Sequence, residues 1–342
     1  MAQVDVTVHS SPGPGKYAWQ MQAIQVAETG GSEVLGLVEL PDPVPGPGQA
    51  VVALEACGVN FIDIYQRTGL YPVPLPFVIG QEGAGVVTAV HPEAGFVEIG
   101  DRVAFTGTLG GYADQIVVPT ESLVVVPDGI ATDVAAAAML QGLTARYLAH
   151  ETYRLGPESK CLIHAGAGGV GQLLIQMARQ SGATVLATVG TDAKARLAAA
   201  AGADHVIVYT RSDFRAEVEA VVGERGLDVV YDSVGVATFE GGLDLLRPRG
   251  TMVLYGQSSG PVPPLDLGAL GRAGSLFVTR PRLGDYIGGR ANLAAQAGEL
   301  FAAIGDGSLQ VQIGATFPLA SAAAAHEALE SRATTGKVLL IP

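Results

Sequence analysis

A glycine-rich segment offers the most specific chemistry in the chain. Gly166, Gly168 and Gly171 follow the pattern G-x-G-x-x-G, between a predicted strand at 161–165 and a predicted helix at 170–180. Glycine lets the backbone turn sharply and approach a pyrophosphate, whose charge is stabilised by the free N–H groups at the helix start. A glycine-rich turn without a ligand is the alternative, but a turn between strand and helix favours a dinucleotide-binding site.

The residues after the next predicted strand indicate which dinucleotide binds. Enzymes that use NAD usually carry an acidic residue about 20 positions after the first glycine, where it binds the ribose hydroxyls. Thr188, Val189 and Gly190 stand there instead, and Lys194 follows. A lysine near a position without a carboxylate suits a 2′-phosphate, so the sequence favours NADP. Asp192 would oppose this if it pointed inward, but it is equally suited to cap the next helix.

Strands and helices alternate around the glycine segment. The elements predicted there cover residues 161–165, 170–180, 184–189, 193–201, 205–209, 214–222, 228–232, 238–246, 251–255 and 276–279. This alternation predicts an α/β fold with a doubly wound sheet of six parallel strands. Helices at 286–304 and 320–330 and a closing strand at 337–341 are expected to follow. Residues 21–140 carry valine-rich strands broken by Gly and Pro, which is typical of a mostly β domain.

Composition and charge exclude several classes of protein. The 342 residues, 48% of them hydrophobic, suffice for two domains with their own cores. A net charge of −13 repels nucleic acid and anionic lipid, and no apolar run reaches the ~20 residues of a membrane span. Cys57 and Cys161 have no paired spacing and are interpreted as reduced, buried thiols. Residues 1–20 lack the pattern of a secretion signal, so we expect an N-terminal extension on a cytoplasmic protein.

Two features could suggest other chemistry. Residues 256–260 fit G-x-S-x-G, but that motif must lead into a helix, which Pro261 and Pro263 prevent. His164 lies in the predicted strand after residue 160 and is expected to be a core imidazole rather than a catalytic base. Neither feature favours a hydrolase.

Six ordered segments carry a resemblance to a known family. They are 58–63 (GVNFID), 80–85 (GQEGAG), 100–103 (GDRV), 141–144 (QGLT), 231–235 (YDSVG) and 330–334 (ESRAT). With the glycine segment, they resemble the zinc-independent branch of the medium-chain dehydrogenase/reductase superfamily, specifically the zeta-crystallin-like NADPH:quinone oxidoreductases. The resemblance implies a GroES-like, mostly β catalytic domain of residues 21–143 and 281–342, beside an NADP-binding Rossmann domain of residues 144–280.

The same superfamily contains zinc-dependent alcohol dehydrogenases, from which this sequence differs. Their cysteine and histidine zinc ligands stand at the positions of Asn60 and Gln81, and a structural zinc site would need four cysteines where the chain has two. We therefore predict no metal. Hydride transfer from a reduced nicotinamide to an electrophilic quinone needs mainly positioning and a polar pocket, so quinone reduction is favoured.

The resemblance also implies roles for individual residues. The side chains expected to face the nicotinamide and the substrate are Asn60, Asp63, Tyr65, Tyr71 and Thr144. Asn60 would bind the cofactor and the tyrosines would line the quinone pocket; half-buried structural tyrosines and a capping Asp63 are the alternative. The 2′-phosphate would lie among Lys194, Tyr209 and Arg332. Other cofactor contacts are expected at Gly166, Gly168, Gly169, Val170, Thr191, Ser233, Gln257 and Val278.

Two further functions stay open beside an NADPH-dependent quinone reductase. An enoyl or enone reductase would use the same hydride but needs a proton donor such as Tyr65 or Tyr71 for the α-carbon. A non-catalytic NADPH-binding protein is the third, because relatives in the family serve as lens crystallins. By analogy with the family, the apolar strand at 276–279 is expected to pair two subunits into a homodimer.

Overall fold

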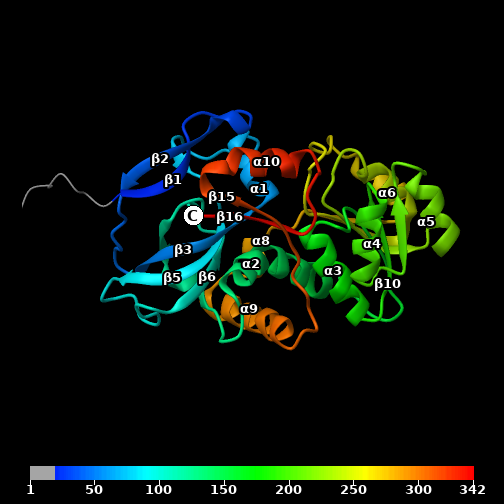
Figure 1. Ribbon diagram of the computed structural model, residues 1–342. Coiled ribbons are helices and arrows are strands. Elements are labelled where there is room, and N and C mark those ends of the chain that lie inside the picture. The colour runs from blue at the N-terminus through cyan, green and yellow to red at the C-terminus, as the bar shows by residue number, and fades with distance from the viewer. Residues whose placement is uncertain (1–19) are drawn as a thin grey trace, which may run out of the picture.

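The computed structural model describes residues 20–342, so the extension predicted at residues 1–20 lies outside the described residues except for Gln20. Figure 1 shows two halves, with strands β1, β2, β3, β5 and β6 on the left and helices α4, α5 and α6 around β10 on the right. Helices α2, α3, α8 and α9 lie between them. The chain ends in the strand-rich half, although residues 160–279 form the other half.

Six parallel strands form one sheet in the order β11-β10-β9-β12-β13-β14. Their bounds are β9 Lys160–Ile163, β10 Thr184–Val189, β11 His205–Val208, β12 Leu227–Asp232, β13 Leu246–Leu254 and β14 Phe277–Thr279. The helices of this half are α3 Gly169–Gln180, α4 Asp192–Ala200, α5 Phe214–Val222, α6 Phe239–Leu245 and α7 Leu267–Arg272. The predicted doubly wound sheet is confirmed. Helix α7 was not predicted, and β13 begins five residues before the predicted 251.

The strand-rich half contains two mainly antiparallel sheets, whose strand orders are β2-β1-β4 and β15-β16-β3-β5-β6-β8. Strand β7 adds to the larger sheet by pairing with β3. The early strands are β1 Gln20–Val26, β2 Leu35–Pro41, β3 Gln49–Val59, β4 Phe77–Val78, β5 Glu82–Val90, β6 Arg102–Thr106, β7 Gln115–Pro119 and β8 Leu123–Val125. The late strands β15 Ile313–Pro318 and β16 Lys337–Ile341 complete the larger sheet, and only their mutual pairing is parallel. The end of the chain therefore returns to the half in which the chain begins.

The strand-rich half also contains helices, of which α2 packs against α3 of the other half. They are α1 Phe61–Arg67, α2 Thr132–Tyr147, α8 Leu283–Tyr286, α9 Arg290–Gly305 and α10 Ala322–Glu330, with short turns at Ser32–Val34, Thr120–Ser122, Leu148–Thr152 and Leu319–Ser321. The helix predicted at 286–304 is α9, which begins four residues later than predicted. Gly289 precedes it with φ +80°, a left-handed conformation that a helix cannot pass through.

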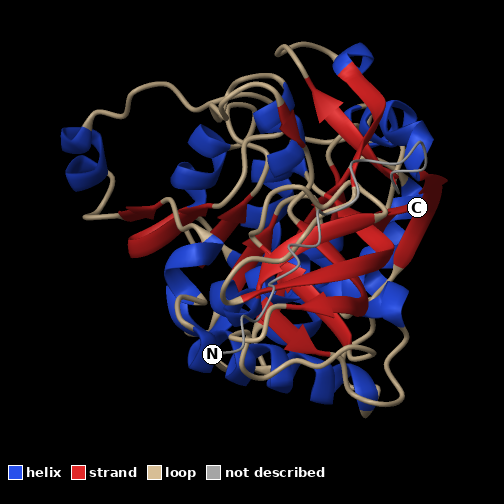
Figure 2. Ribbon diagram, turned by 90° about the vertical axis from the view of Figure 1, so that its left-hand side faces the viewer, coloured by secondary structure: helices blue, strands red, loops and turns tan. Residues whose placement is uncertain are grey.

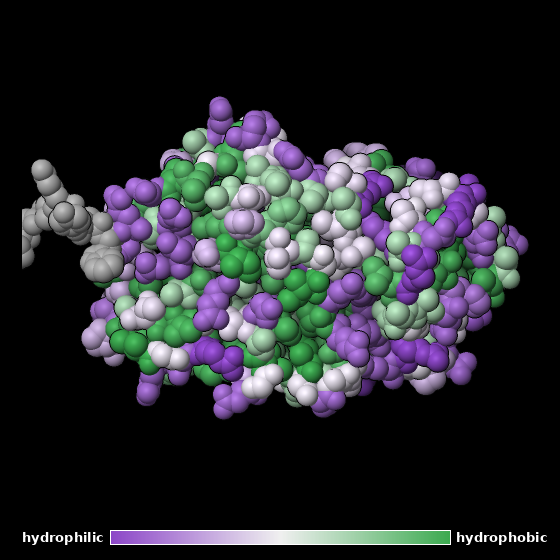
Figure 3. Space-filling view, in the orientation of Figure 1, coloured by the Kyte–Doolittle hydropathy of each residue, from purple (hydrophilic) through white to green (hydrophobic). Residues whose placement is uncertain are grey.

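One apolar core crosses between the halves. It includes Ala84 and Ala104 of the larger β sheet, Ala138 and Leu143 of α2, and Leu173 of α3. Small alanine side chains let α2 lie close to the sheet on one side and to α3 on the other. On the face drawn in Figure 3, hydrophobic residues gather in the middle of the view, at the junction of the halves. The two halves therefore share a core.

The carboxyl ends of the parallel strands face the strand-rich half. In open α/β sheets, ligands bind at this edge, beside the point where the strand order reverses. Here the reversal lies between β9 and β12, which are neighbours in the sheet. Viewed from the strand-rich side in Figure 2, strands cross the middle of the molecule and helices lie mainly toward its periphery. Within residues 20–342, no helix has both the length and the apolarity that a membrane crossing needs.

Candidate active site

The glycine segment forms a tight turn from β9 into α3. Gly168 is the N-cap of α3, and its N–H donates to the Ala165 carbonyl at 2.9 Å. A Cβ on Gly171 would lie 2.4 Å from that same oxygen, and one on Gly166 would lie 2.9 Å from the Ala187 Cβ. These glycines therefore permit the close packing of helix and strand. The first N–H groups of α3 have no acceptor inside the helix, so the turn fits a pyrophosphate.

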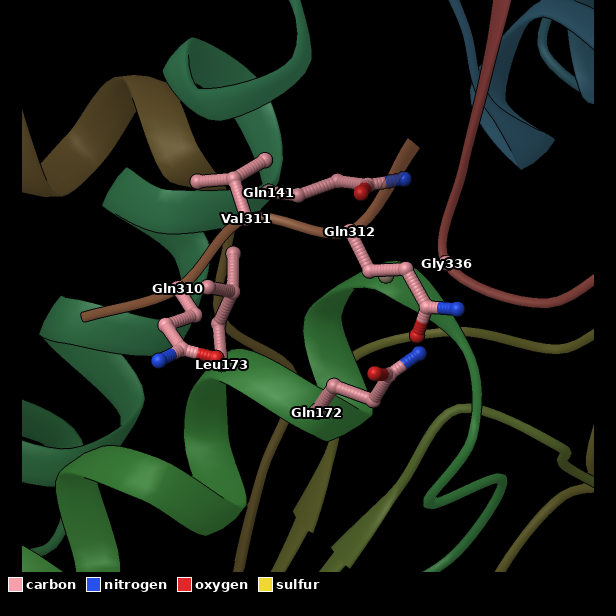
Figure 4. A pocket seen from close by; sticks show the side chains of 8 residues that line it. Gln141, Gln172, Leu173, Gln310, Val311, Gln312 and Gly336 are labelled. Atoms are coloured by element: carbon pink, nitrogen blue, oxygen red, sulfur yellow. The ribbon is translucent and has the colours of Figure 1, made fainter. Parts of the chain in front are cut away.

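A small polar cavity lies beside this turn. Figure 4 shows side chains from α2, α3 and the segment before β15 around it, and its lining includes Gln141, Gln172, Gln310 and Gln312. Its volume of about 10 Å³ suits roughly one water molecule and no cofactor. A Cβ on Gly169 would lie 1.7 Å from Oε1 of Gln141, so the glycine also admits this contact between the halves.

Lys194, Tyr209 and Arg332 come together at the ends of β10 and β11. The Lys194 Nζ donates to the Arg332 carbonyl at 2.6 Å, and an Arg332 Nη lies 3.5 Å from the Tyr209 hydroxyl. Neither cation forms an ion pair with any carboxylate of residues 20–342. Burial and the Arg332 charge lower the pKa of Lys194. Two neighbouring cations without a carboxylate partner in residues 20–342 fit the 2′-phosphate of NADP.

Helix α4 shows which role Asp192 has. Thr191, not Asp192, is the N-cap of α4, and its hydroxyl accepts from the Lys194 backbone N–H at 3.3 Å. Asp192 is the first residue of the helix and forms an ion pair with Arg211. The capping role considered for Asp192 is therefore wrong. Its carboxylate is paired with Arg211, which offsets part of its repulsion of a nearby phosphate.

Tyr65 and Tyr71 form an aromatic pair at the carboxyl edge of the six-stranded sheet. Their ring centroids are 5.2 Å apart and their planes are inclined at 62°. The Tyr65 hydroxyl accepts from the Gln257 backbone N–H at 3.0 Å, and the Tyr71 hydroxyl accepts from Arg280 at 2.9 Å. Burial raises the pKa of Tyr65 to about 12, so its hydroxyl stays protonated and can donate a hydrogen bond. Gln257 follows β13 and Arg280 follows β14, so both contacts bridge the halves.

Asn60 is held in a buried network with Glu82 and Lys337. The Asn60 amide nitrogen donates to Glu82 at 2.9 Å and to the Gly58 carbonyl at 3.3 Å, and its Oδ1 accepts from Lys337 at 2.8 Å. Lys337 and Glu82 form an ion pair, with both side chains 0% exposed. The second Glu82 oxygen accepts from the Leu140 N–H of α2. Both amide hydrogens of Asn60 are engaged, so Oδ1 alone has capacity for a further bond.

Asp63 lies behind Asn60 at the start of α1. Its Oδ2 accepts from the Asn60 N–H at 2.8 Å and from the Tyr112 hydroxyl at 2.9 Å, while its Oδ1 has no partner. Burial raises the pKa of Asp63 to about 7, although the two hydrogen bonds lower it. Tyr112 also contacts His326, which contacts Arg67. With no exposed surface, Asp63 caps α1 and orients Asn60.

Other predicted residues lie in α2 or near the carboxyl ends of the parallel strands. Thr144 is buried in α2, Ser233 follows β12 and Val278 lies in β14. No helix follows residues 256–260 until α7, which confirms that this segment is not a nucleophile elbow. His164 follows β9 instead of lying within it, and its Nδ1 lies 2.8 Å from the Thr188 hydroxyl, as a core imidazole would.

The residues beside Asn60 do not fit a catalytic zinc. A zinc site needs cysteine, histidine or carboxylate ligands, whereas Asn60 contacts the Lys337 ammonium. In residues 20–342, no group of three or more His, Cys, Asp or Glu side chains could hold a metal ion. The sequence reasoning did not single out Lys337, Glu82 or Arg280. A charge at the edge of an apolar run, as in KVLLI at 337–341, was the available signal for Lys337.

Comparison with known proteins covers both halves. The family model described as alcohol dehydrogenase GroES-like domain matches residues 46–128, and the one described as zinc-binding dehydrogenase matches residues 201–340. A quinone oxidoreductase of Pseudomonas aeruginosa is 46% identical over 93% of this chain and 99% of its own. A 2-haloacrylate reductase of a Burkholderia species is 39% identical over 98% of each chain. The crystal structure of Escherichia coli quinone oxidoreductase complexed with NADPH has a TM-score of 0.92 at 42% identity, covering 94% of this chain and 100% of that one.

Proposed function

This chain belongs to the quinone oxidoreductase family, in the zinc-independent branch of the medium-chain dehydrogenase/reductase superfamily, and we propose that it is an NADPH-dependent quinone reductase. The observation that carries the proposal is the position of the Tyr65 and Tyr71 hydroxyls. They meet Gln257 and Arg280 at the carboxyl edge of the parallel sheet, where a polar acceptor would lie. The cation pair of Lys194 and Arg332 supports NADPH as the donor.

We propose that each part of the cleft has one task. When bound, NADPH supplies the hydride. The N–H groups at the start of α3 bind the pyrophosphate, and Lys194, Tyr209 and Arg332 bind the 2′-phosphate. Asn60, held by Glu82 and Lys337, offers the remaining acceptor capacity of Oδ1 to the cofactor. Further cofactor contacts are proposed for the turn residues and for Thr144, Thr191, Ser233, Gln257 and Val278.

The Tyr65 and Tyr71 hydroxyls act as donors in this proposal. Each oxygen already accepts one hydrogen bond, from Gln257 or from Arg280, so its own hydrogen is free to point at a substrate oxygen. A hydroxyl that accepts a bond from a cation is polarised and donates more strongly. Asp63 acts through Asn60 as a positioning residue. A quinone needs these donors but no covalent partner from the protein.

The test follows NADPH oxidation by the purified protein with quinones and with enones, each repeated with NADH. We expect turnover with quinones and a clear preference for NADPH. Turnover with enones alone would contradict quinone reduction. Tight NADPH binding without turnover against the whole panel would favour the non-catalytic alternative.

A double-bond reductase is the second candidate. The 39% identity to 2-haloacrylate reductase favours it, because that protein is named for an acceptor with an activated double bond. Tyr65 and Tyr71 supply the hydroxyl donors that protonation of a carbon would need. Replacing either tyrosine by phenylalanine should then reduce enone turnover more than quinone turnover, since a quinol takes protons from water.

We also propose a cytoplasmic homodimer, with domains at 21–143 plus 281–342 and at 144–280. Edge strand β14 pairs with β13 on one side, and Phe277 on it is 57% exposed, which supports pairing of β14 with a second copy. The buried free cysteines Cys57 and Cys161 are compatible with a reducing compartment. Light scattering on Phe277→Asp should show a smaller particle than the unchanged protein; a monomer in both would contradict the dimer.

A further inference from the structure

Arg280 is a cation beside Tyr71 that has no carboxylate partner in the described part of the chain. It follows β14 directly, and its Nη atoms donate to the Tyr71 hydroxyl at 2.9 Å and to the Leu254 carbonyl at 3.0 Å. No carboxylate oxygen of residues 20–342 lies within the 4.0 Å of an ion pair. The side chain is exposed. A guanidinium has five N–H donors, so three remain for another ligand.

The place of Arg280 in the sheet separates it from the phosphate-binding cations. Lys194 follows β10, whereas Arg280 follows β14 at the opposite edge. Three strands lie between β10 and β14, so at about 4.8 Å per strand the two ends are ~19 Å apart. A dinucleotide whose 2′-phosphate lies at Lys194 would extend toward the β13 and β14 end. Arg280 therefore stands at the acceptor end of the cleft, with Tyr71.

The contacts of Arg280 hold its guanidinium in place. The Leu254 carbonyl lies at the end of β13, and the Tyr71 hydroxyl belongs to the other half. The Arg280 side chain is therefore fixed from two directions. A fixed, planar fork suits the two oxygens of a carboxylate or sulfonate. The net charge of −13 repels an anionic acceptor in general. A local, unpaired cation would overcome that repulsion at this point of the cleft.

Resting on the proposed function, we infer that Arg280 is a specificity-determining residue that binds an anionic group of the acceptor. The substrate class is then quinones or enones that carry a carboxylate or sulfonate substituent. The neutral ring or double bond lies toward Tyr65, and the charged group lies toward the exposed side of Arg280. Neighbouring Arg282 provides a contrast, because it lies near Asp285, with 3.7 Å between nitrogen and oxygen.

The experiment measures binding and turnover of 1,4-naphthoquinone and its 2-sulfonate. Calorimetry on protein saturated with NADP⁺ gives the dissociation constants without turnover. We expect Arg280→Gln to lower the ratio of sulfonate to neutral affinity by about 10-fold or more, because a charge-assisted bond is lost. The same ratio of kcat/KM should fall with NADPH. Arg280→Lys should recover part of the loss, and added salt should weaken sulfonate binding to the unchanged protein.

Arg282→Gln is the matched control and should leave both ratios unchanged. Equal losses for the neutral and the sulfonated quinone in Arg280→Gln would overturn the inference and assign Arg280 to the contact between the halves. The inference would also be overturned if the main effect of Arg280→Gln were a loss of NADPH affinity. Charge-dependent binding without any turnover would support Arg280 while contradicting quinone reduction, so the two failures are distinguishable.

Discussion

The buried cation of the strand-rich half and the paired cations of the six-stranded half are arranged in opposite ways. Lys337 is 0% exposed and has the Glu82 carboxylate and the Asn60 amide as partners. Lys194 and Arg332 lie near the surface, where the Lys194 ammonium donates to the Arg332 carbonyl, and neither has a carboxylate partner among residues 20–342. A charge that is buried away from water requires an oppositely charged or hydrogen-bonding partner, whereas an exposed charge can stay unpaired until a ligand binds. The pairing of a cation thus indicates whether it holds the fold or binds an anion.

The largest effect is expected at the buried pair. Lys337→Met leaves the Glu82 carboxylate buried without a counter-charge, so the free energy of unfolding should fall by about 3–5 kcal/mol. Urea unfolding measures it. Lys337→Met with Glu82→Gln removes both charges and should recover more than half of the loss.

Exposed Lys160 provides the control for this comparison. Lys160→Met should change the free energy of unfolding by less than about 0.5 kcal/mol, because its side chain is exposed and forms no ion pair with residues 20–342. Similar losses of unfolding free energy in Lys160→Met and Lys337→Met would contradict the distinction between buried and accessible cations.

The buried Asp63 extends the comparison to pH. Its pKa of about 7 lies above its ordinary value of 3.8, so the folded protein binds the extra proton between pH 4 and 7 and loses stability as pH rises through that range. Asp63→Asn abolishes this loss. The stability of the variant relative to the unchanged protein should therefore rise by about 2–4 kcal/mol from pH 4 to 7.

His326 gives this pH profile a second, opposite component. Burial lowers the pKa of His326 to about 3, so the unfolded chain binds its proton more readily and stability rises with pH up to about 6.5. In Asp63→Asn the free energy of unfolding should rise with pH up to about 6.5, because the opposing contribution of Asp63 is absent. Chemical unfolding at several pH values tests both signs, and parallel curves for the two proteins would refute the assignment to Asp63.

A smaller effect is expected at the accessible cations. Lys194→Ala or Arg332→Ala should weaken NADPH binding by roughly 10- to 100-fold, equivalent to ~1.5–3 kcal/mol, and spare NADH. Unfolding free energies should barely change, since neither side chain has a buried partner. Calorimetric titration with both nucleotides measures this. Equal losses for NADPH and NADH would show that these residues do not bind the 2′-phosphate.

Local sequence patterns predicted the six-stranded half well. Strand β10 and helix α5 begin and end where predicted, because their apolar periodicity is unbroken and turn residues flank them. Helix α2 was not predicted. Its run of alanines has no polar face, since the larger β sheet covers one side and α3 the other.

Two predicted site residues show how far a motif can assign a role. The segment 58–63 drew attention to Asn60 and Asp63, but it could not show which groups contact their polar atoms. Asn60 contacts residues from two other strands, and Asp63 contacts Tyr112. Burial of a side chain depends on elements far away in the chain, so a sequence motif does not distinguish a ligand contact from a positioning residue.

The sequence by itself determined the parallel sheet and the glycine turn, and it favoured NADP through the residues from Thr188 to Lys194, because each of these features depends on residues within about 30 positions of one another. Only the tertiary structure decided the partners of the charged side chains. Lys337 meets Glu82 across 255 positions, and Arg280 meets Tyr71 across 209. Such contacts form when separate elements pack together, and they decide which charges are neutralised in the core and which stay available to a ligand.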